Sequence, residues 1–475
     1  MSKELWQESA TSLAKKIKSG ETTSRDVIES HLGRIEEINT SVNAIVEIHP
    51  DEVRRNADAA DAAQKSGAPL GPLHGVPFTV KVNLDLAGHA TTHGSVALKD
   101  NVVTGNAPAV ERMLQAGGVA LGHTNMPDLG LRINTQSALH GDTHNPWRHG
   151  VTAAGSSGGE AAAISSGMSP IGLGNDIGGS LRNPAYACGI ASIKPSRGRV
   201  PGGNPSDPYP MNLNAQIMLV DGVLARTIDD VRTGLEAVMG AHPNDPISLS
   251  APLKGAPVPK RVALVPEPIG GSTHPDIAEG VRIAGRALSA AGYEVEEIEI
   301  PMLFDAYFNW AELMMQNSEQ NYELFKGAIG EGGMRFLDLA GSDFPPMSPA
   351  DLHRMHNHRH TIAKTWRMFM SQYPLIVGPV WTQPPFEHNF DTKDTESAMQ
   401  VIEMYRFVLP ANLLGLPAAC VATGVANGLP TGVQVMGDMF REDVCLDAAE
   451  VIESAVGVLT PVSYTHLTLP TILRV

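Results

Sequence analysis

The chain is poor in cysteine and in positive charge. Its three cysteines (Cys188, Cys420 and Cys445) are too few and too scattered among 475 residues for a disulfide framework or a four-cysteine zinc site, and they suit a reducing compartment. The 35 Lys and Arg residues are outnumbered by 51 Asp and Glu residues, which gives a formal net charge of −16. Because phosphate contacts need clustered positive charge, this balance argues against nucleic acid or an anionic membrane as a partner.

Long hydrophobic runs are also missing. No stretch approaches the ~20 apolar residues that cross a bilayer, and the first residues, MSKELWQESATSLAKK, lack the apolar segment of a signal peptide. Charged residues make up only 18% of the chain, below the usual ~25%, and hydrophobic residues make up 42%, so much of the chain is expected to lie in an interior. We therefore predict a soluble, cytoplasmic, globular protein and exclude a disordered scaffold.

Helical and strand-like patterns alternate along the chain. Apolar residues recur at helical spacing in two stretches between residues 4 and 40, separated at Gly20. A strand follows at 76–82, where alternation places Thr79 and Lys81 on the face opposite the apolar side chains. This alternation of helices and strands favours the α/β fold class. Further strands are expected at 261–266, 293–300 and 375–380, two more at 417–435 joined at Asn427-Gly428, and further helices at 276–291, 305–328 and 350–371.

Residues 150–200 are small, rich in glycine and serine, and nearly uncharged. A good helix sequence at 161–166 is followed by a short apolar strand at 170–174 and then by Asp-Ile-Gly-Gly-Ser at 176–180. A strand that runs through such a turn into a helix leaves several backbone N–H groups unpaired, and glycines let a substrate carbonyl approach them. Ser180 would lie beside that anion site, which is the arrangement that an acyl-transfer nucleophile needs.

These motifs make the chain resemble the amidase signature family of serine hydrolases, of the aryl-amidase or urethanase kind. The likeness rests on GVPFTVK at 75–81, GSSGG at 155–159 and DIGGS at 176–180, and it extends over nearly all of residues 4–435. It implies the fold of that family, in which helices cover both faces of a large, mixed, twisted central sheet.

The resemblance also implies a Ser–cis-Ser–Lys triad and no cofactor or metal. Ser180 would be the nucleophile, Ser156 the bridging serine after a cis peptide bond, and Lys81 the base. A neutral Lys81 near pH 8 needs its pKa depressed by about two units, for which burial in an uncharged pocket is the means. The implied oxyanion hole consists of the backbone N–H groups of Ile177, Gly178, Gly179 and Ser180.

Three positions depart from the usual residues of the family. Ala154 stands where glycine is common, Asn175 where Thr or Ser is common, and Val82 where Asp often follows the lysine. We expect none of the three to touch an atom that does the chemistry, although Val82 would alter the surroundings of the lysine.

The resemblance organises the chain as a single domain over residues 1–462. An N-terminal helical pair at about 4–40 precedes the signature core at about 70–200, and a variable region at about 300–400 would shape the substrate pocket. The end of the chain, VSYTHL from residue 462, resembles the translation of a transposon end used in sequencing adaptors. We therefore interpret residues 463–475 as a non-native tail.

Several weaker motifs favour structural explanations. Ser157 completes a G-x-S-x-G pattern, but a poor strand precedes it, and Ser12 to Lys15 matches S-x-x-K on an amphipathic helix. Asp176 and Arg182 are expected to cap or pair within their loop rather than to catalyse. The remaining candidates are expected to have structural roles. We expect a solvated or packed helix face for His353, His356 and His360. Core packing is favoured over an acyl pocket for Trp310, Met314 and Met315.

We thus predict an amidase that hydrolyses a carboxylic amide, with ester, anilide and carbamate (urethane) cleavage as extensions. The alternative is the A subunit of a glutamine-dependent tRNA amidotransferase, whose usual Asp-Thr-Gly-Gly-Ser differs from the Asp-Ile-Gly-Gly-Ser found here. A small-molecule amide or carbamate is the expected partner, and a homodimer is left open. The sequence leaves the substrate-binding residues unknown. Three segments are proposed to supply them, 125–136, 310–316 and 381–386, but only a structure can show which of their side chains point into the pocket.

Overall fold

An eleven-stranded mixed sheet organises the molecule. The computed structural model describes residues 4–207, 211–320, 322–341 and 347–461, so the predicted tail at 463–475 lies outside the described residues. Parallel pairs (β2 with β3 and β8, β11 with β12 and β13) combine with antiparallel ones. In spatial order the strands are β1 (Ile45–Ile48), β3 (Val119–Thr124), β2 (Pro77–Lys81), β8 (Ile171–Asp176), β10 (Val220–Ala225), β9 (Ala191–Lys194), β14 (Ala418–Ala426), β15 (Leu429–Gly437), β13 (Leu375–Pro379), β11 (Arg261–Leu264) and β12 (Glu294–Glu297).

Alternate residues of these strands enter two separate hydrophobic cores, one on each face of the sheet. In β14, for example, Ala418 and Cys420 belong to one core, and Ala419 and Val421 belong to the other. The first core is covered by α2 (Ser24–Val42), α3 (Pro50–Lys65), α5 (Gly158–Ser165), α6 (Arg182–Cys188), α7 (Leu213–Met218), α10 (Leu303–Gln320), α12 (Glu331–Gly341), α13 (Pro349–Met370), α14 (Thr395–Met404) and α15 (Leu409–Leu413). The second is covered mainly by α1 (Ala10–Ser19), α4 (Pro108–Gln115), α8 (Ile228–Val238), α9 (Pro275–Ala290) and α16 (Glu442–Val456).

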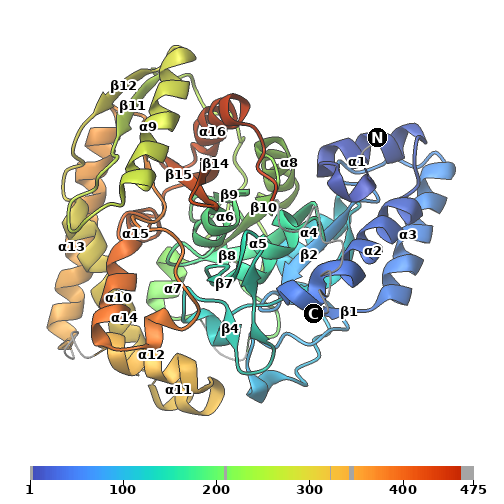
Figure 1. Ribbon diagram of the computed structural model, residues 1–475, viewed down its shortest axis with the longest axis horizontal. Coiled ribbons are helices and arrows are strands. Elements are labelled where there is room, and N and C mark those ends of the chain that lie inside the picture. The colour runs from blue at the N-terminus through green and yellow to red at the C-terminus, as the bar shows by residue number, and fades with distance from the viewer. Residues whose placement is uncertain (1–3, 208–210, 321, 342–346, 462–475) are drawn as a thin grey trace, which may run out of the picture.

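The two ends of the sheet carry different helices. Helices α1, α2 and α3 lie at one end of the molecule, beside β1 and β2, whereas α9, α13, β11 and β12 lie at the other (Figure 1). Helix α11 (Tyr322–Ala328) and two hairpins, β4 (Gln136–Ser137) with β5 (Gly141–Asp142) and β6 (His144–Asn145) with β7 (Arg148–Thr152), complete the larger elements. The arrangement confirms the predicted α/β fold. Among the described helices, none combines the length and the apolar character needed to cross a bilayer.

Local signals in the sequence explain many of the boundaries. The predicted helical pair is α1 and α2: Gly20 ends α1 with φ 76°, and Thr23 begins α2 with a capping box to Asp26. The predicted late strands join at Asn427 and Gly428, whose φ angles of 50° and 75° fit a tight hairpin turn. Six elements were not predicted from the sequence: β1, α3, β9, β10, α8 and α12. Strand β10 was hard to find because Asp221 and Gly222, which are poor strand formers, lie inside it.

Candidate active site

Lys81 is fully buried at the end of β2. The alternation of that strand directs Phe78 and Val80 into one core and Lys81 toward the opposite face, as predicted. The Lys81 Nζ donates to Ser156 Oγ at 2.8 Å and to Asn175 Oδ1 at 2.7 Å. Burial lowers the pKa of Lys81 to about 7, although the charges of nearby carboxylates act to raise it. The amine can therefore be neutral near physiological pH.

Two serines line a cavity next to this buried amine, and one of them, Ser156, contacts it. Ser156 follows a cis peptide bond from Gly155, two residues before α5 begins, and Ser180 lies in the turn between β8 and α6. Their residues are 4% and 6% exposed, and both line the same cavity. Within the described chain, no hydrogen bond joins the two hydroxyls directly. The structure therefore brings Ser156 and Ser180 to one cavity, places Lys81 behind it in contact with Ser156, and shows a direct contact for one of the two expected proton transfers.

The turn from Asp176 to Ser180 lines the cavity through Ile177, Gly178 and Ser180. The Asp176 carboxylate accepts from the Gly179 N–H at 2.7 Å. Over the residues that the structure describes, the N–H groups of Ile177, Gly178 and Ser180 donate to no other residue. Three of the four predicted donors are thus free for a substrate oxygen, whereas the Gly179 N–H is already engaged and its predicted role is not favoured by this geometry.

Trp310 of α10 fixes the outer side of this turn. Its indole Nε1 donates to the Ile177 carbonyl oxygen at 2.8 Å. A Cβ on Gly178 would lie 2.6 Å from the Trp310 ring, so this position accepts glycine alone without rearrangement. Contact with a helix distant in sequence therefore holds the turn that precedes Ser180.

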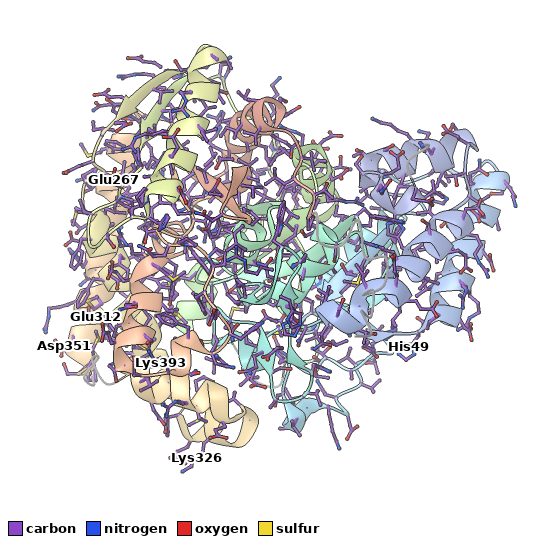
Figure 2. All side chains as sticks on the ribbon, in the orientation of Figure 1. His49, Glu267, Glu312, Lys326, Asp351 and Lys393 are labelled. Atoms are coloured by element: carbon purple, nitrogen blue, oxygen red, sulfur yellow. The ribbon has the colours of Figure 1, made fainter. Side chains whose placement is uncertain are left out.

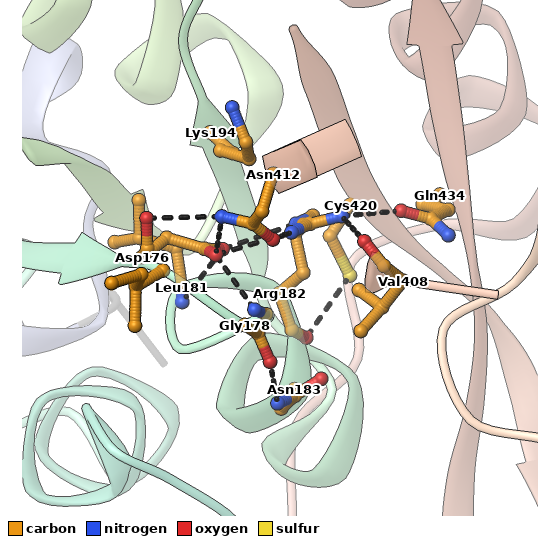
Figure 3. Close-up of polar contacts among 12 residues, drawn as sticks. Asp176, Gly178, Leu181, Arg182, Asn183, Lys194, Val408, Asn412, Cys420 and Gln434 are labelled. Carbon is orange, nitrogen blue, oxygen red and sulfur yellow. Dashed lines mark hydrogen bonds and ion pairs between the residues drawn. The ribbon is translucent and has the colours of Figure 1, made fainter. Parts of the chain in front are cut away.

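A buried ion pair fixes the inner side of the turn (Figure 3). The Arg182 guanidinium donates to both oxygens of Asp176, at 3.1 Å each, and also to Asn412, Gln434 and the Val408 carbonyl. Burial alone would raise the pKa of Asp176, but the charge and hydrogen bonds of Arg182 lower it to about 2. This agrees with the structural role predicted for Asp176 and Arg182.

Asn175 corrects an expectation from the sequence. It was expected not to touch any atom that does the chemistry, yet its Oδ1 lies 2.7 Å from Lys81 Nζ and the residue lines the cavity. The error has a simple cause. Residue 175 precedes the Asp-Ile-Gly-Gly-Ser motif on β8, and only the parallel pairing of β2 with β8 reveals that it faces the end of β2.

Glu160 was also missed. It is fully buried on α5 and accepts from Thr124 Oγ1 at 2.7 Å and from Thr79 Oγ1. Burial raises its pKa to about 7 despite these hydrogen bonds. Because Thr79 and Thr124 belong to the neighbouring strands β2 and β3, Glu160 ties the start of α5, and with it Ser156, to the strand that carries Lys81.

The cavity at the serines has a volume of about 730 Å³ and is mostly apolar. Two of the three segments proposed for the substrate pocket contribute to it, 125–136 and 310–316, but 381–386 does not; Trp381 instead donates to Asn183 Oδ1 at 3.0 Å inside the core. Trp310, Met314 and Met315, expected to be core, line the cavity as well: Trp310 belongs to the first core, and the two methionines are partly buried against it. The remaining lining residues are Asn83, His93, Leu129, Gly130, Leu131, Ile133, Asn175, Ile177, Gly178, Asp207, Met211, Asn212, Leu219, Phe325, Phe336, Leu337 and Tyr405.

The competing motifs lie elsewhere. Ser157 is fully buried and does not line the cavity, and Ser12 of α1 donates to the Glu8 carboxylate. His353 and His360 are exposed on α13, which agrees with a solvated face. In the described ranges, the one group of side chains spaced to hold a metal ion is Glu47, His49 and His89, and it includes none of the α13 histidines.

The chain is similar to known proteins over most of its length. The family model described as Amidase matches residues 26–446. The chain is 36% identical over 472 residues to "Indoleacetamide hydrolase" of Bradyrhizobium diazoefficiens, covering 96% of this chain and 88% of that protein. It is 30% identical over 468 residues to "Acylamidase" of Rhodococcus erythropolis, covering 94% and 95%. Identity to the A subunit of the glutamyl-tRNA(Gln) amidotransferase of a Synechococcus strain is 29% over 478 residues, covering 94% and 95%.

Solved structures share the fold over nearly the whole chain. One is 6-aminohexanoate cyclic dimer hydrolase complexed with substrate, with a TM-score of 0.83, 25% identity and coverage of 97% of this chain and 99% of that one. Another is a bacterial aryl acylamidase belonging to the amidase signature enzymes, with a TM-score of 0.80, 25% identity and coverage of 94% and 96%.

The ion pair under the turn generates a stability prediction. Arg182→Ala leaves a buried, uncompensated carboxylate at Asp176 and should lower the free energy of unfolding by about 3–5 kcal/mol in urea denaturation. Arg367→Ala is the matched control, because Arg367 pairs with Asp438 at 3.6 Å with its side chain 75% exposed, and its effect should be far smaller. Equal losses for the two variants would contradict a structural role for Arg182.

Proposed function

The chain belongs to the amidase family and hydrolyses amide C–N bonds, and from this premise we propose that it does so through an acyl-enzyme on Ser180. One observation carries the assignment: the buried amine of Lys81 contacts Ser156 at 2.8 Å, in the cavity that Ser180 also lines. Burial and the lowered pKa of Lys81 supply the base that such a reaction needs near neutral pH.

The proposed reaction begins with two proton transfers. Neutral Lys81 accepts the proton of Ser156 across their existing contact, and Ser156 accepts the proton of Ser180. The second contact is absent from the free enzyme, and substrate binding would close it, since catalytic hydrogen bonds often tighten in the complex. Ser180 Oγ then attacks the amide carbonyl carbon.

The free N–H groups of the turn would stabilise the negative charge that forms on the carbonyl oxygen. Those of Ile177, Gly178 and Ser180 are available for this role. Ser156 passes its proton to the leaving amine as the C–N bond breaks, and the Lys81 ammonium returns its proton to Ser156. Water then hydrolyses the ester on Ser180, which regains its proton. These steps use side chains and water alone, so they require no cofactor.

Asn175 is a positioning residue in this scheme. Its Oδ1 accepts from Lys81 Nζ at 2.7 Å and thereby holds the amine beside Ser156. The amide oxygen performs this task without carrying a full negative charge. A carboxylate in its place would favour the charged ammonium form of the lysine.

The cavity supports amides with an aromatic or bulky apolar acyl group as substrates. Its volume of about 730 Å³ and its lining by Trp310, Phe336, Tyr405 and methionines suit such a group. The name of one relative, an indoleacetamide hydrolase, points the same way, because indole is aromatic. Ester, anilide and carbamate cleavage extend the proposal, because the same attack on a carbonyl carbon serves all of them.

The further expectations from the sequence stay proposals. We place the protein in the cytoplasm, with residues 1–462 as its single domain and small molecules rather than nucleic acid or membrane as partners; its oligomeric state, including a homodimer, is left open. The amidotransferase subunit remains the alternative, at 29% identity against 36% for the indoleacetamide hydrolase.

The nucleophile can be tested with a serine-directed fluorophosphonate. Ser180→Ala should abolish labelling and amide hydrolysis, because the attacking oxygen is removed. Ser157→Ala is the control: it deletes a hydroxyl that lies outside the cavity, on the residue next in sequence to Ser156, and labelling should persist. Loss of labelling in Ser157→Ala with retention in Ser180→Ala would transfer the nucleophile to Ser157.

The base can be tested through the pH dependence of kcat/KM. Activity should fall below a pH of about 7, where Lys81 becomes protonated, and Lys81→Ala should lower kcat/KM by roughly 10²–10⁴-fold and remove this limb. Asn175→Asp should move the limb to higher pH by about 1 unit or more, since a carboxylate would favour the charged lysine.

Asn212→Asp is the control for Asn175→Asp. Asn212 lines the same cavity, but its Oδ1 accepts from Ala215 at the start of α7 rather than from Lys81. Equal displacement of the acidic limb in both variants would show that any added charge in the cavity acts on the base, and would refute a specific contact from Asn175.

The substrate class can be tested with purified chain and a panel of arylacetamides, anilides, short aliphatic amides and an aryl carbamate. Aromatic acyl groups should raise kcat/KM by at least about tenfold over acetamide, and Phe336→Ala should reduce that preference. Val425→Ala, on an exposed strand position, should leave it unchanged. Ammonia release from glutamine without turnover of any simple amide would instead favour the amidotransferase subunit.

A further inference from the structure

Three histidines and two glutamates gather at the β1 edge of the sheet, away from the catalytic cavity. Glu47 lies on β1, His49 precedes α3, and His89 lies in the segment between β2 and α4. One ligand atom from each of these three residues lies within 4.8 Å of the others. In Figure 2, His49 lies on the opposite side of the view from Glu312 of α10, the helix that also carries the cavity residue Trp310.

The distances in this group suit metal coordination. Glu47 Oε1 lies 3.0 Å from His49 Nε2 and 3.2 Å from His89 Nδ1. With metal–ligand bonds of about 2.0–2.2 Å, neighbouring ligand atoms of a tetrahedral site are separated by roughly 3.3–3.6 Å. Small side-chain movements would therefore place an ion between the three atoms.

A second layer of contacts orients two of these ligands. Glu52 Oε1 lies 3.4 Å from His89 Nε2 and so can hold the His89 ring through that nitrogen, while Nδ1 lies on the side of Glu47 Oε1, where an ion would bind. The other oxygen of Glu47 accepts from His123 Nδ1 at 2.6 Å, an outer contact of the kind that accompanies metal-bound carboxylates.

A small cavity gives an ion access to this group. It has a volume of about 140 Å³ and is lined by His49, Glu52 and His89 among others. The His49 side chain is 54% exposed, so solvent reaches the site directly. A water molecule could therefore complete the coordination.

We propose that Glu47, His49 and His89 bind a divalent transition-metal ion of the zinc type at a site separate from the amidase chemistry. Two imidazole nitrogens and one carboxylate oxygen form a donor set suited to zinc rather than to calcium or magnesium. None of the three residues lines the catalytic cavity.

Binding there would have a structural consequence. His89 lies in the same segment as Asn83 and His93, which both line the catalytic cavity. An ion held by His89 and by Glu47 of β1 would tie this wall of the cavity to the edge of the sheet.

The test uses the full chain without an affinity tag, stripped with EDTA, and follows Zn²⁺ by calorimetry and Co²⁺ by absorption. One ion should bind per chain with a Kd in the micromolar range or tighter, with the intense visible bands of tetrahedral Co²⁺. His89→Ala and His49→Gln should each weaken binding by about tenfold or more. His49 is exposed, so its variant keeps the test valid if His89→Ala does not fold.

His353→Ala is the matched control, because His353 is an exposed histidine on α13 outside the group. It should leave the Kd unchanged. No saturable binding up to about 100 μM Zn²⁺, or equal weakening by His353→Ala, would overturn the proposal. The first result would mean that protons alone satisfy the contacts of Glu47.

Discussion

The uncharged state of a lysine amine inside the protein is the constraint on which the active site depends. Lys81 has three carboxyl groups in its electrostatic surroundings, Asp176, Asp221 and Glu160, and each of them in its charged form favours the ammonium. The structure limits this effect in two ways. The charge of Asp176 is balanced by Arg182, whereas burial raises the pKa of Glu160 and of Asp221 to about 7. The same loss of solvent that lowers the pKa of the base therefore raises that of two acids around it.

Positioning of the site comes from contacts across the sheet rather than from any one loop. Lys81 ends β2, Ser156 lies before α5, and Ser180 follows β8, and Glu160 joins the first two through hydroxyl groups of adjacent strands. The turn at Ser180 is held between Arg182 on its inner side and Trp310 on its outer side. Substitutions far from Ser180 in sequence can therefore displace the nucleophile and the free N–H groups together.

Short-range features of the sequence predicted the fold class and the location of the chemistry. Glycine positions, capping residues and strand alternation identified α1, α2, β2 and the late hairpin, because each depends on residues only a few positions apart. The motifs around 75–81, 155–159 and 176–180 indicated Lys81, Ser156 and Ser180; the two serines line one cavity, and Lys81 contacts Ser156. Family membership and amide hydrolysis, predicted from those motifs, are confirmed by the family match.

What sequence reasoning missed depends on register and on long-range packing. The contact of Asn175 with Lys81 follows from the pairing of β2 with β8, and the engagement of the Gly179 N–H follows from the direction of the Asp176 side chain. Likewise, Trp381 looked like a pocket residue but packs in the core, and Met314 and Met315 looked like core but line the cavity. An apolar side chain carries the same local signal in either place, so only the fold distinguishes them.

The cavity wall divides into two parts of different origin, and this division separates chemistry from selectivity. One side is the signature core, with Ser156, Asn175 and Ser180; the other is built largely from α10, α11 and α12, which supply Trp310, Phe325 and Phe336. Trp310 bonds the Ile177 carbonyl of the turn, whereas the two phenylalanine side chains have no group that could form such a hydrogen bond. Changes in the other aromatic residues can therefore reshape the space for an acyl group while leaving the proton path from Ser180 to Lys81 intact, whereas a change at Trp310 would alter both.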